Sequence, residues 1–212
     1  KITAYANQNI SPFSETLPED EKTSVEKYKG FYIGRYEAGD KENTEAKTLR
    51  SSNDVTKTVT IKANQAPYNY VTRTQAQNLA SNVNSGTKTS SLMFGVQWDL
   101  VLAFMRKDTA KITSTSVLTE NSTTIGNYCD NLWTIKNANA QYSEDGGDTF
   151  KACPNPFKKE SYSSILLTTG ADNSFSVQNI YDIAGNVNEW TLENTSFTDF
   201  PCAYRGGDYY AT

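Results

Sequence analysis

The chain has 212 residues, of which 37 per cent are hydrophobic and 12 per cent aromatic, and its formal net charge is -4. Its many Tyr, Phe and Trp residues supply bulky apolar surface that disordered chains lack, so we expect one folded domain with its own core. Charges of both signs are scattered, and without a basic stripe nucleic acid is excluded as a partner. No apolar run is long enough for a membrane-spanning helix.

The first 29 residues read as an N-terminal arm. They are polar, contain Pro12, Pro18 and an acidic cluster, and show little apolar periodicity. From Gly30 the segment GFYIGRYEAG alternates between two faces, which is typical of a strand. We therefore expect the folded domain to span residues 30–212. Residues 55–61 alternate again and predict a second strand or an edge hairpin.

Two helices are predicted after Pro67. Thr72 or Thr74 is placed to cap the first, which is expected to end near residues 84–86. The second spans about residues 95–107 and has basic residues in its last turn, where the helix dipole favours cations. Apolar residues at helical spacing form one stripe on each helix: Ala76, Leu79, Ala80 and Val83 on the first, and Trp98, Val101, Leu102 and Met105 on the second.

From residue 108 to about 160 the periodicity fades, and Thr, Ser, Asn, Gly and Asp prevail. This composition predicts long irregular loops, which are generally functional or held by cross-links or ions. After residue 160, short apolar runs between turn residues indicate short strands.

Three cysteines, Cys129, Cys153 and Cys202, have spacings that fit neither a redox pair nor a zinc ribbon. One disulfide outside the cytosol, with Cys129 and Cys153 closing the shortest loop, is one interpretation. Three free thiols are the other.

Two motifs lie near the C-terminal end, NIYDIAGNVNEWT at residues 179–191 and YRGG at 204–207. Gly185 permits a sharp turn that a side chain would forbid. The paired glycines of the second motif allow close backbone packing or form a strand bulge. Arg205 is placed either to pair with a buried carboxylate such as Glu189 or Glu37, or to face solvent.

With GFYIGRYEAG at residues 30–39 and VQWDLVLAF at 96–104, these motifs resemble the formylglycine-generating-enzyme, or sulfatase-modifying-factor, family, a relative of the C-type lectin fold. The resemblance covers roughly Gly30 to Gly207. It implies an α+β, C-type lectin-like fold with two helices, short antiparallel strands and much irregular loop. Asn188 departs from the family, which usually has Trp there. The family also continues past RGG, so the C-terminal part of the domain is expected to be missing.

The resemblance implies a structural calcium ion, which the family often holds near this turn. Its ligands would be Asn186, the Val187 carbonyl and Glu189, oxygen donors of the kind calcium prefers. The alternative is that Asn186 and Glu189 hydrogen-bond to the loop backbone while Trp190 lies in the core.

The resemblance to the family does not extend to its catalytic residues. The family's enzymes bind copper through two cysteines just beyond the RGGS strand, where this chain reads DYYAT. Relatives that bind iron use histidines, and this chain has none, which also removes histidine acid–base chemistry and serine triads. We therefore expect no catalytic residues, no copper and no iron in these residues.

The expected function is a non-catalytic recognition module, an adhesin-like protein at a bacterial cell surface, in the extracellular space or on a phage particle, which binds a glycan or a surface protein through its loops. Some relatives are variable proteins of diversity-generating retroelements, which implies variation at residues 208–210. The alternatives are a copper-dependent oxidase with its cysteines in the missing C-terminus and a structural subunit of a pilus or phage tail. The candidate contact residues are Tyr128, Trp133, Tyr142, Asp208, Tyr209 and Tyr210.

Overall fold

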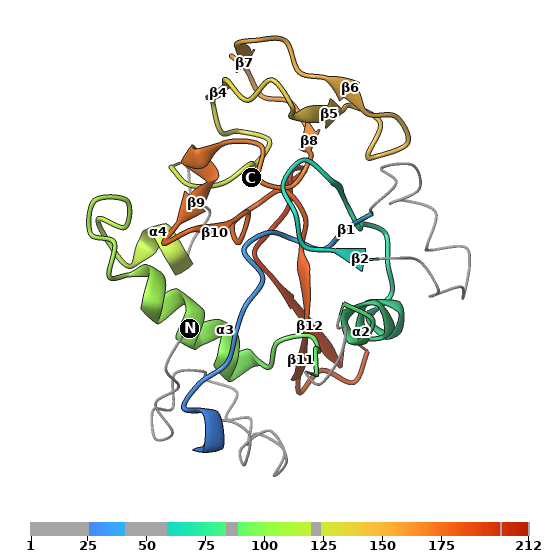
Figure 1. Cartoon of the computed structure of the whole chain (residues 1–212), viewed down its shortest axis with the longest axis vertical. Coiled ribbons are helices and arrows are strands. Elements are labelled where there is room, and N and C mark those ends of the chain that lie inside the picture. The colour runs from blue at the N-terminus through green and yellow to red at the C-terminus, as the bar shows by residue number, and fades with distance from the viewer. Residues whose placement is uncertain (1–25, 41–58, 84–88, 120–123, 200, 212) are drawn as a thin grey trace.

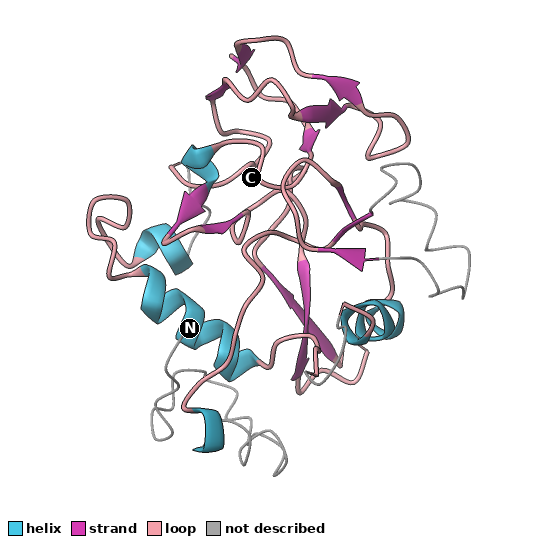
Figure 2. Ribbon diagram, viewed as in Figure 1, coloured by secondary structure: helices cyan, strands magenta, loops and turns pink. Residues whose placement is uncertain are grey.

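The structure, a computed structural model, describes residues 26–40, 59–83, 89–119, 124–199 and 201–211. Helices and several small antiparallel sheets are joined by long loops (Figures 1 and 2). The predicted arm lies almost wholly outside the described residues. The helices are α2 (Arg73–Ser81), α3 (Gly95–Met105), α4 (Ser116–Thr119) and the 3-10 helix η2 (Asn173–Phe175).

The strands are short and pair antiparallel, in the orders β2-β1-β3, β6-β5-β8, β4-β7, β10-β9 and β11-β12. Their bounds are β1 (Gly39–Asp40), β2 (Val59–Thr60), β3 (Ala66–Pro67), β4 (Trp133–Ile135), β5 (Gln141–Ser143), β6 (Lys151–Ala152), β7 (Phe157–Lys159), β8 (Leu166–Leu167), β9 (Ser176–Val177), β10 (Ile180–Tyr181), β11 (Glu189–Asn194) and β12 (Cys202–Arg205).

The strand predicted across residues 30–39 is much shorter than expected, because β1 begins only at Gly39. Both strands that pair with β1 are also two residues long, so within the described residues this ladder does not extend back over the alternating segment. An alternating sequence pattern gives a segment two distinct faces, but the segment forms a strand only where a neighbouring strand pairs with its backbone N–H and C=O groups. The second predicted strand appears as β2, and residues 55–58 lie outside the described ranges.

Helix α2 begins at the predicted cap. The Thr72 hydroxyl accepts from the Gln75 amide at 3.2 Å, and the Gln75 side chain accepts from the Thr72 amide at 2.8 Å. This reciprocal arrangement satisfies two amides that the first turn leaves without partners. The helix ends at Ser81, earlier than expected, and its buried residues are Gln75 and Leu79, whereas Val83 is exposed.

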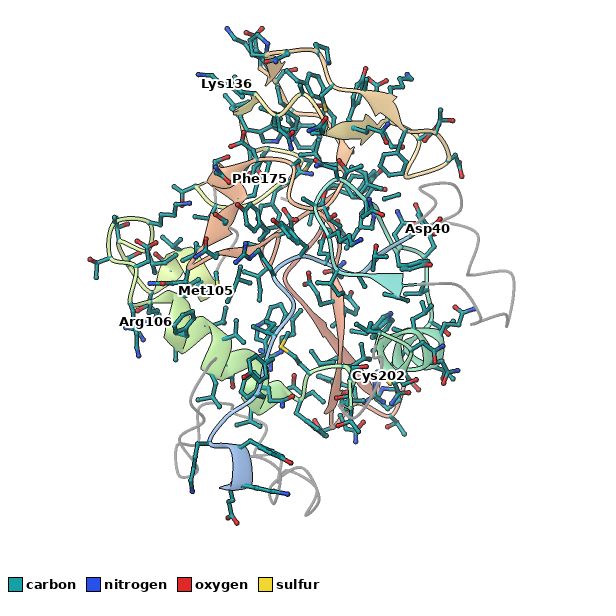
Figure 3. All side chains as sticks on the ribbon, in the orientation of Figure 1. Asp40, Met105, Arg106, Lys136, Phe175 and Cys202 are labelled. Carbon is teal, nitrogen blue, oxygen red and sulfur yellow. The ribbon has the colours of Figure 1, made fainter. Side chains whose placement is uncertain are left out.

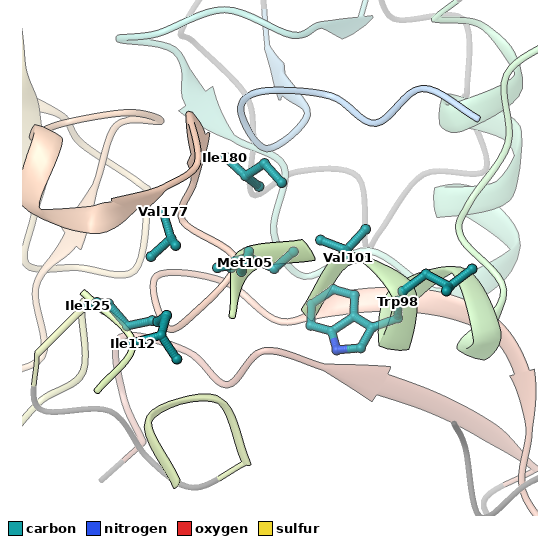
Figure 4. Packing of buried hydrophobic residues seen from close by; sticks show 9 residues of the cluster. Trp98, Val101, Met105, Ile112, Ile125, Val177 and Ile180 are labelled. Atoms are coloured by element: carbon teal, nitrogen blue, oxygen red, sulfur yellow. The ribbon is translucent and has the colours of Figure 1, made fainter. Parts of the chain in front are cut away.

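Helix α3 supplies one wall of the largest core cluster (Figure 4). Its predicted inward residues Trp98, Val101 and Met105 are buried, and Leu102 packs at the margin. They meet apolar residues from later segments of the chain, namely Ile112, Ile125, Val177 and Ile180.

A second core lies under the region predicted to be irregular, which instead contains α4 and β4 to β7. The Trp133 ring meets Phe157 and Phe175 edge-on, at centroid distances of 5.3 and 6.2 Å. Long loops with little regular structure are therefore held here by an aromatic core.

The three cysteines are free. Cys129 and Cys153 are buried, while Cys202 lies beside α2, with its sulfur 3.4 Å from Nη1 of Arg73 (Figure 3). Among the described residues, no helix has the length and apolar character needed to cross a membrane.

Candidate functional site

The Gly185 turn packs directly against the backbone of Asn127. Gly185 has φ +71° and Asn186 has φ +61°, so two consecutive residues are left-handed. A Cβ at Gly185 would lie 2.5 Å from the Asn127 carbonyl oxygen, and the Asn186 amide donates to that oxygen at 2.9 Å. Glycine is therefore required at 185 by backbone conformation and by the closeness of the neighbouring chain.

The Asn186 side chain joins this turn to three other segments. Its Oδ1 accepts from Nδ2 of Asn127 and from the Leu167 amide, both at 3.0 Å. Its Nδ2 donates to Oε2 of Glu37 at 2.8 Å and to the Leu167 carbonyl at 3.2 Å. These bonds use the two acceptor and two donor positions of the amide, and Asn186 is only 1 per cent exposed.

Three carboxyl groups, those of Glu37, Asp182 and Glu189, converge beneath the turn. Burial raises the pKa of each one, to about 7 for Asp182, and the charge of Asp182 raises the pKa of the other two further. Such shifts follow when charged carboxylates are removed from water and placed near one another.

The three carboxyl groups differ in their hydrogen bonds. Oε1 of Glu37 accepts from the Val187 amide at 3.3 Å, and Oδ2 of Asp182 accepts from the Gly170 amide at 2.6 Å. Oε2 of Glu189 is buried, has no hydrogen-bond partner among the described residues, and lies against Gly206, where a Cβ would overlap it. Gly206, with φ +93°, therefore leaves room for this carboxyl group.

The predicted calcium ligands Asn186, Val187 and Glu189 thus lie on one turn but in different surroundings. Oδ1 of Asn186 already accepts two hydrogen bonds, whereas Oε2 of Glu189 accepts none. In the described part of the chain, no three His, Cys, Asp or Glu side chains form a group that could hold a metal ion. Calcium binding stays a prediction.

Arg205 pairs with a buried carboxylate, but that of Glu193 rather than the expected Glu189 or Glu37. Its Nε donates to Oε2 at 2.9 Å and its Nη2 donates to Oε1 at 2.7 Å. Residue 205 stands opposite Glu189 in the β11-β12 ladder, yet the register shifts between Trp190 and Asn194. Glu193 lies within this irregular stretch, which the sequence alone does not reveal.

The segment after RGG is fastened on two sides. The Tyr209 amide donates to the Asn186 carbonyl, and the Cys129 amide donates to the Ala211 carbonyl, both at 3.0 Å. Oδ1 of Asp208 accepts from the amides of Tyr210 and Ala211, at 2.9 and 3.0 Å. Residues 208–211, close to the label C in Figure 1, therefore form a closed turn tied to the scaffold.

Four tyrosines from three segments lie next to one another at this surface. The Tyr209 side chain hydrogen-bonds with Tyr70, and its ring centroid is 6.5 Å from that of Tyr210. The Ser163 amide donates to the Cys129 carbonyl at 2.9 Å, and the Cys129 amide donates to the Ala211 carbonyl, so the segments that carry Tyr162 and Tyr210 flank the same residue. We call Tyr70, Tyr162, Tyr209 and Tyr210 the tyrosine row, of which Tyr70, Tyr162 and Tyr210 are 40, 66 and 70 per cent exposed.

The predicted contact residues do not form a single surface. Asp208, Tyr209 and Tyr210 lie on the fastened C-terminal segment, at or beside the tyrosine row. Tyr128 and Trp133 lie in the interior, where they donate to the Gly206 carbonyl at 2.7 Å and to Oδ1 of Asn127 at 3.1 Å. Tyr142 is partly exposed, with its ring 4.5 Å from that of Phe157.

Sequence reasoning missed Tyr70 and Tyr162. Both stand in loops far from residue 209 along the chain, and no local pattern marks them. Only the folded chain brings them to the C-terminal segment.

The chain matches no protein-family model, no curated protein and no solved structure. Its function has to be inferred from the chemistry of the surface and the turn.

Proposed function

We propose that this chain is a non-catalytic recognition module, extracellular or displayed on a cell or phage surface, that binds its ligand through the tyrosine row. The observation that supports the proposal is the convergence of four tyrosines from three chain segments, three of them well exposed. Exposed aromatic rings gathered in one place are typical of binding surfaces.

Tyrosine suits this role because it offers a large amphipathic contact area while few rotatable bonds are frozen on binding. Backbone hydrogen bonds to Asn186 and from Cys129 already order the segment that carries Tyr209 and Tyr210. A surface fixed before the ligand arrives loses less entropy on association than a mobile loop does.

We further propose that the scaffold is C-type lectin-like, in the manner of formylglycine-generating-enzyme domains. The support consists of the helices α2 and α3, the short antiparallel strands, and the packing of the 185–190 turn beside the RGG strand, where Glu189 is opposite Arg205. A lectin-like scaffold would hold long irregular loops still, which the proposed binding surface needs.

The test is a binding screen of the full chain against glycans and surface proteins, performed with and without a calcium chelator. The double variant Tyr162→Ala/Tyr210→Ala is compared with Tyr32→Ala, which removes a 79 per cent exposed tyrosine outside the row. We expect the double variant to weaken binding about tenfold or more and the control to leave it unchanged.

A ligand that binds both variants equally would contradict the proposal. The chelator arm reports separately on calcium, because loss of binding or of thermal stability with chelator, restored by added calcium, would support the predicted metal site.

A further inference from the structure

A pocket of about 180 Å³ opens between β4 and η2, with the nearly buried Trp133 and Phe175 at its base. An open groove of about 530 Å³, bordered by β7, adjoins it, and the two share Leu132, Trp133 and Thr134 as a common wall. We propose that this pocket is a second binding site, which takes one sugar ring of a neutral glycan while the next ring lies along the groove. The site goes beyond the proposed recognition through the tyrosine row, because no residue that lines the pocket or the groove belongs to the row.

The base of the pocket is held in place from several sides. Nε1 of Trp133 donates to Oδ1 of Asn127 at 3.1 Å, and the Trp133 ring meets that of Phe175 edge-on, at a centroid distance of 6.2 Å. The ammonium group of the buried Lys159 lies over the Trp133 ring, with Nζ 5.8 Å from the ring centroid. The pocket therefore has its shape before a ligand arrives, so little conformational entropy is lost on binding.

A carboxylate stands at the wall of the pocket with one oxygen little used. Oδ1 of Asp172 accepts from the amide and the hydroxyl of Ser174, at 2.9 and 3.0 Å, and so caps η2. Among the described residues, Oδ2 accepts only a long hydrogen bond of 3.5 Å, from the amide of Lys136, which is labelled above Phe175 in Figure 3. Oδ2 can therefore accept from a ligand hydroxyl, and the exposed Thr134 hydroxyl can donate or accept.

An apolar side chain lies uncovered beside these polar groups. Leu132 is 64 per cent exposed and separates the pocket from the groove. A ligand that covers Leu132 with C–H groups removes apolar surface from water, which favours binding. A sugar ring carries C–H groups and hydroxyls on one small frame, so it can contact Leu132 and hydrogen-bond to Asp172 at the same time.

Size and charge narrow the class of ligand. The pocket is smaller than the roughly 300–1,000 Å³ of sites for drug-sized molecules, so it holds one small ring. Asp172 is the one charged residue among the described residues that line it, so an anionic ligand would find no counter-charge there. The groove has Lys158 and Glu160, one charge of each sign, and both can hydrogen-bond to the hydroxyls of a second ring. A neutral glycan satisfies the pocket and the groove together.

The experiment titrates the full chain, by NMR, with the methyl glycosides of glucose, galactose, mannose and N-acetylglucosamine and with linear trisaccharides of the same sugars. The reporter is the indole N–H resonance of Trp133, which Trp133→Phe identifies among the three tryptophans. We expect at least one sugar to shift this resonance saturably. Its trisaccharide should bind about tenfold more tightly, because the groove adds contacts to the second ring. Methylammonium and glucuronate, the cationic and anionic probes, should not displace it.

Variants locate the site. Leu132→Ala should weaken sugar binding about tenfold, because it removes the apolar wall. Phe197→Ala is the matched control, since Phe197 is 67 per cent exposed and lies between β11 and β12, and it should leave the affinity unchanged. Asp172→Asn should weaken sugar binding less than about threefold, because an amide oxygen still accepts from hydroxyls, whereas an ammonium ligand would lose at least about tenfold. Circular dichroism verifies that each variant is folded.

No saturable shift of the Trp133 resonance with any of these sugars, or equal effects of Leu132→Ala and Phe197→Ala, would overturn the inference. Tighter binding of methylammonium than of every sugar, lost in Asp172→Asn, would replace the glycan by an amine. If sugar binding is lost in Tyr162→Ala/Tyr210→Ala but kept in Leu132→Ala, this inference fails while recognition through the tyrosine row stands. If Leu132→Ala weakens binding and the row variants affect no ligand, the pocket stands and the row fails.

Discussion

Arg205 holds the carboxylate of Glu193 through two parallel hydrogen bonds, in a site where the Glu193 side chain is only 1 per cent exposed. The Glu193 carboxyl group also packs against the start of α3, where a Cβ at Gly95 would lie only 2.8 Å from its Cδ. Asp99, on the same helix as Gly95, is 3.8 Å from the same guanidinium. One arginine thus ties β11, β12 and α3 together.

Removing one member of this buried pair should be costly. We expect Arg205→Met to lower the free energy of unfolding by about 3–5 kcal/mol, because Glu193 would remain buried and charged without its partner. Urea denaturation measures the change. Glu144→Gln breaks the pair between Glu144 and Lys151, both of whose side chains are more than half exposed, and should change the free energy of unfolding far less than Arg205→Met does. Equal effects of the two substitutions would show that Arg205 does not stabilise the fold in this way.

The stability of the chain should fall as pH rises from about 4 to 7. The folded pKa of Asp182 is about 7, above its ordinary value of 3.8, so the folded chain keeps a proton that the unfolded chain releases in this window. Because the folded state binds more protons there, the free energy of unfolding decreases with increasing pH. Glu37 and Glu189, whose pKa values are also raised by burial, act in the same direction.

Asp182→Asn is the variant that tests this dependence, since an amide oxygen can still accept the hydrogen bond from Gly170. We expect a flatter profile of unfolding free energy against pH than in the unsubstituted chain. Urea titrations at several pH values between 4 and 8 give both profiles. An unchanged slope would show that Asp182 does not hold its proton in the folded state.

A comparison of Gly185 with Gly146 distinguishes two reasons why glycine is needed: a left-handed backbone and a lack of space for a Cβ. Both have φ +71°, so alanine at either position pays about 1–2 kcal/mol for a left-handed backbone. Only Gly185→Ala is also expected to push a Cβ into the Asn127 backbone, and it should cost more than about 3 kcal/mol in total. Thermal and urea unfolding of the two variants measure the difference. Similar losses of unfolding free energy in the two variants would mean that the Asn127 backbone moves aside for the Cβ without destabilising the fold.

Asn186→Asp distinguishes a structural amide from a calcium ligand. The new carboxylate would lose the two bonds that Nδ2 donates and would face Glu37, so we expect a loss of at least about 2 kcal/mol at neutral pH and partial recovery in acid. Unfolding is followed with and without added calcium. A variant that calcium restores fully would instead support Asn186 as a metal ligand.

The sequence determined the local elements whose causes are themselves local. The Thr72 cap set the start of α2, and apolar spacing identified the buried face of α3, because each depends on residues within two turns of helix. The requirement for glycine at 185 was also visible, since a sharp turn leaves a signature in the chain itself.

Tertiary structure decided which distant groups meet. The choice of Glu193 for Arg205 depended on a shifted register, and the shortness of β1 depended on the length of its partners. Tyr70, which contacts Tyr209, comes from a loop more than one hundred residues away along the chain. Contacts of this kind are fixed by packing of the whole domain, and no pattern within a short stretch of sequence encodes them.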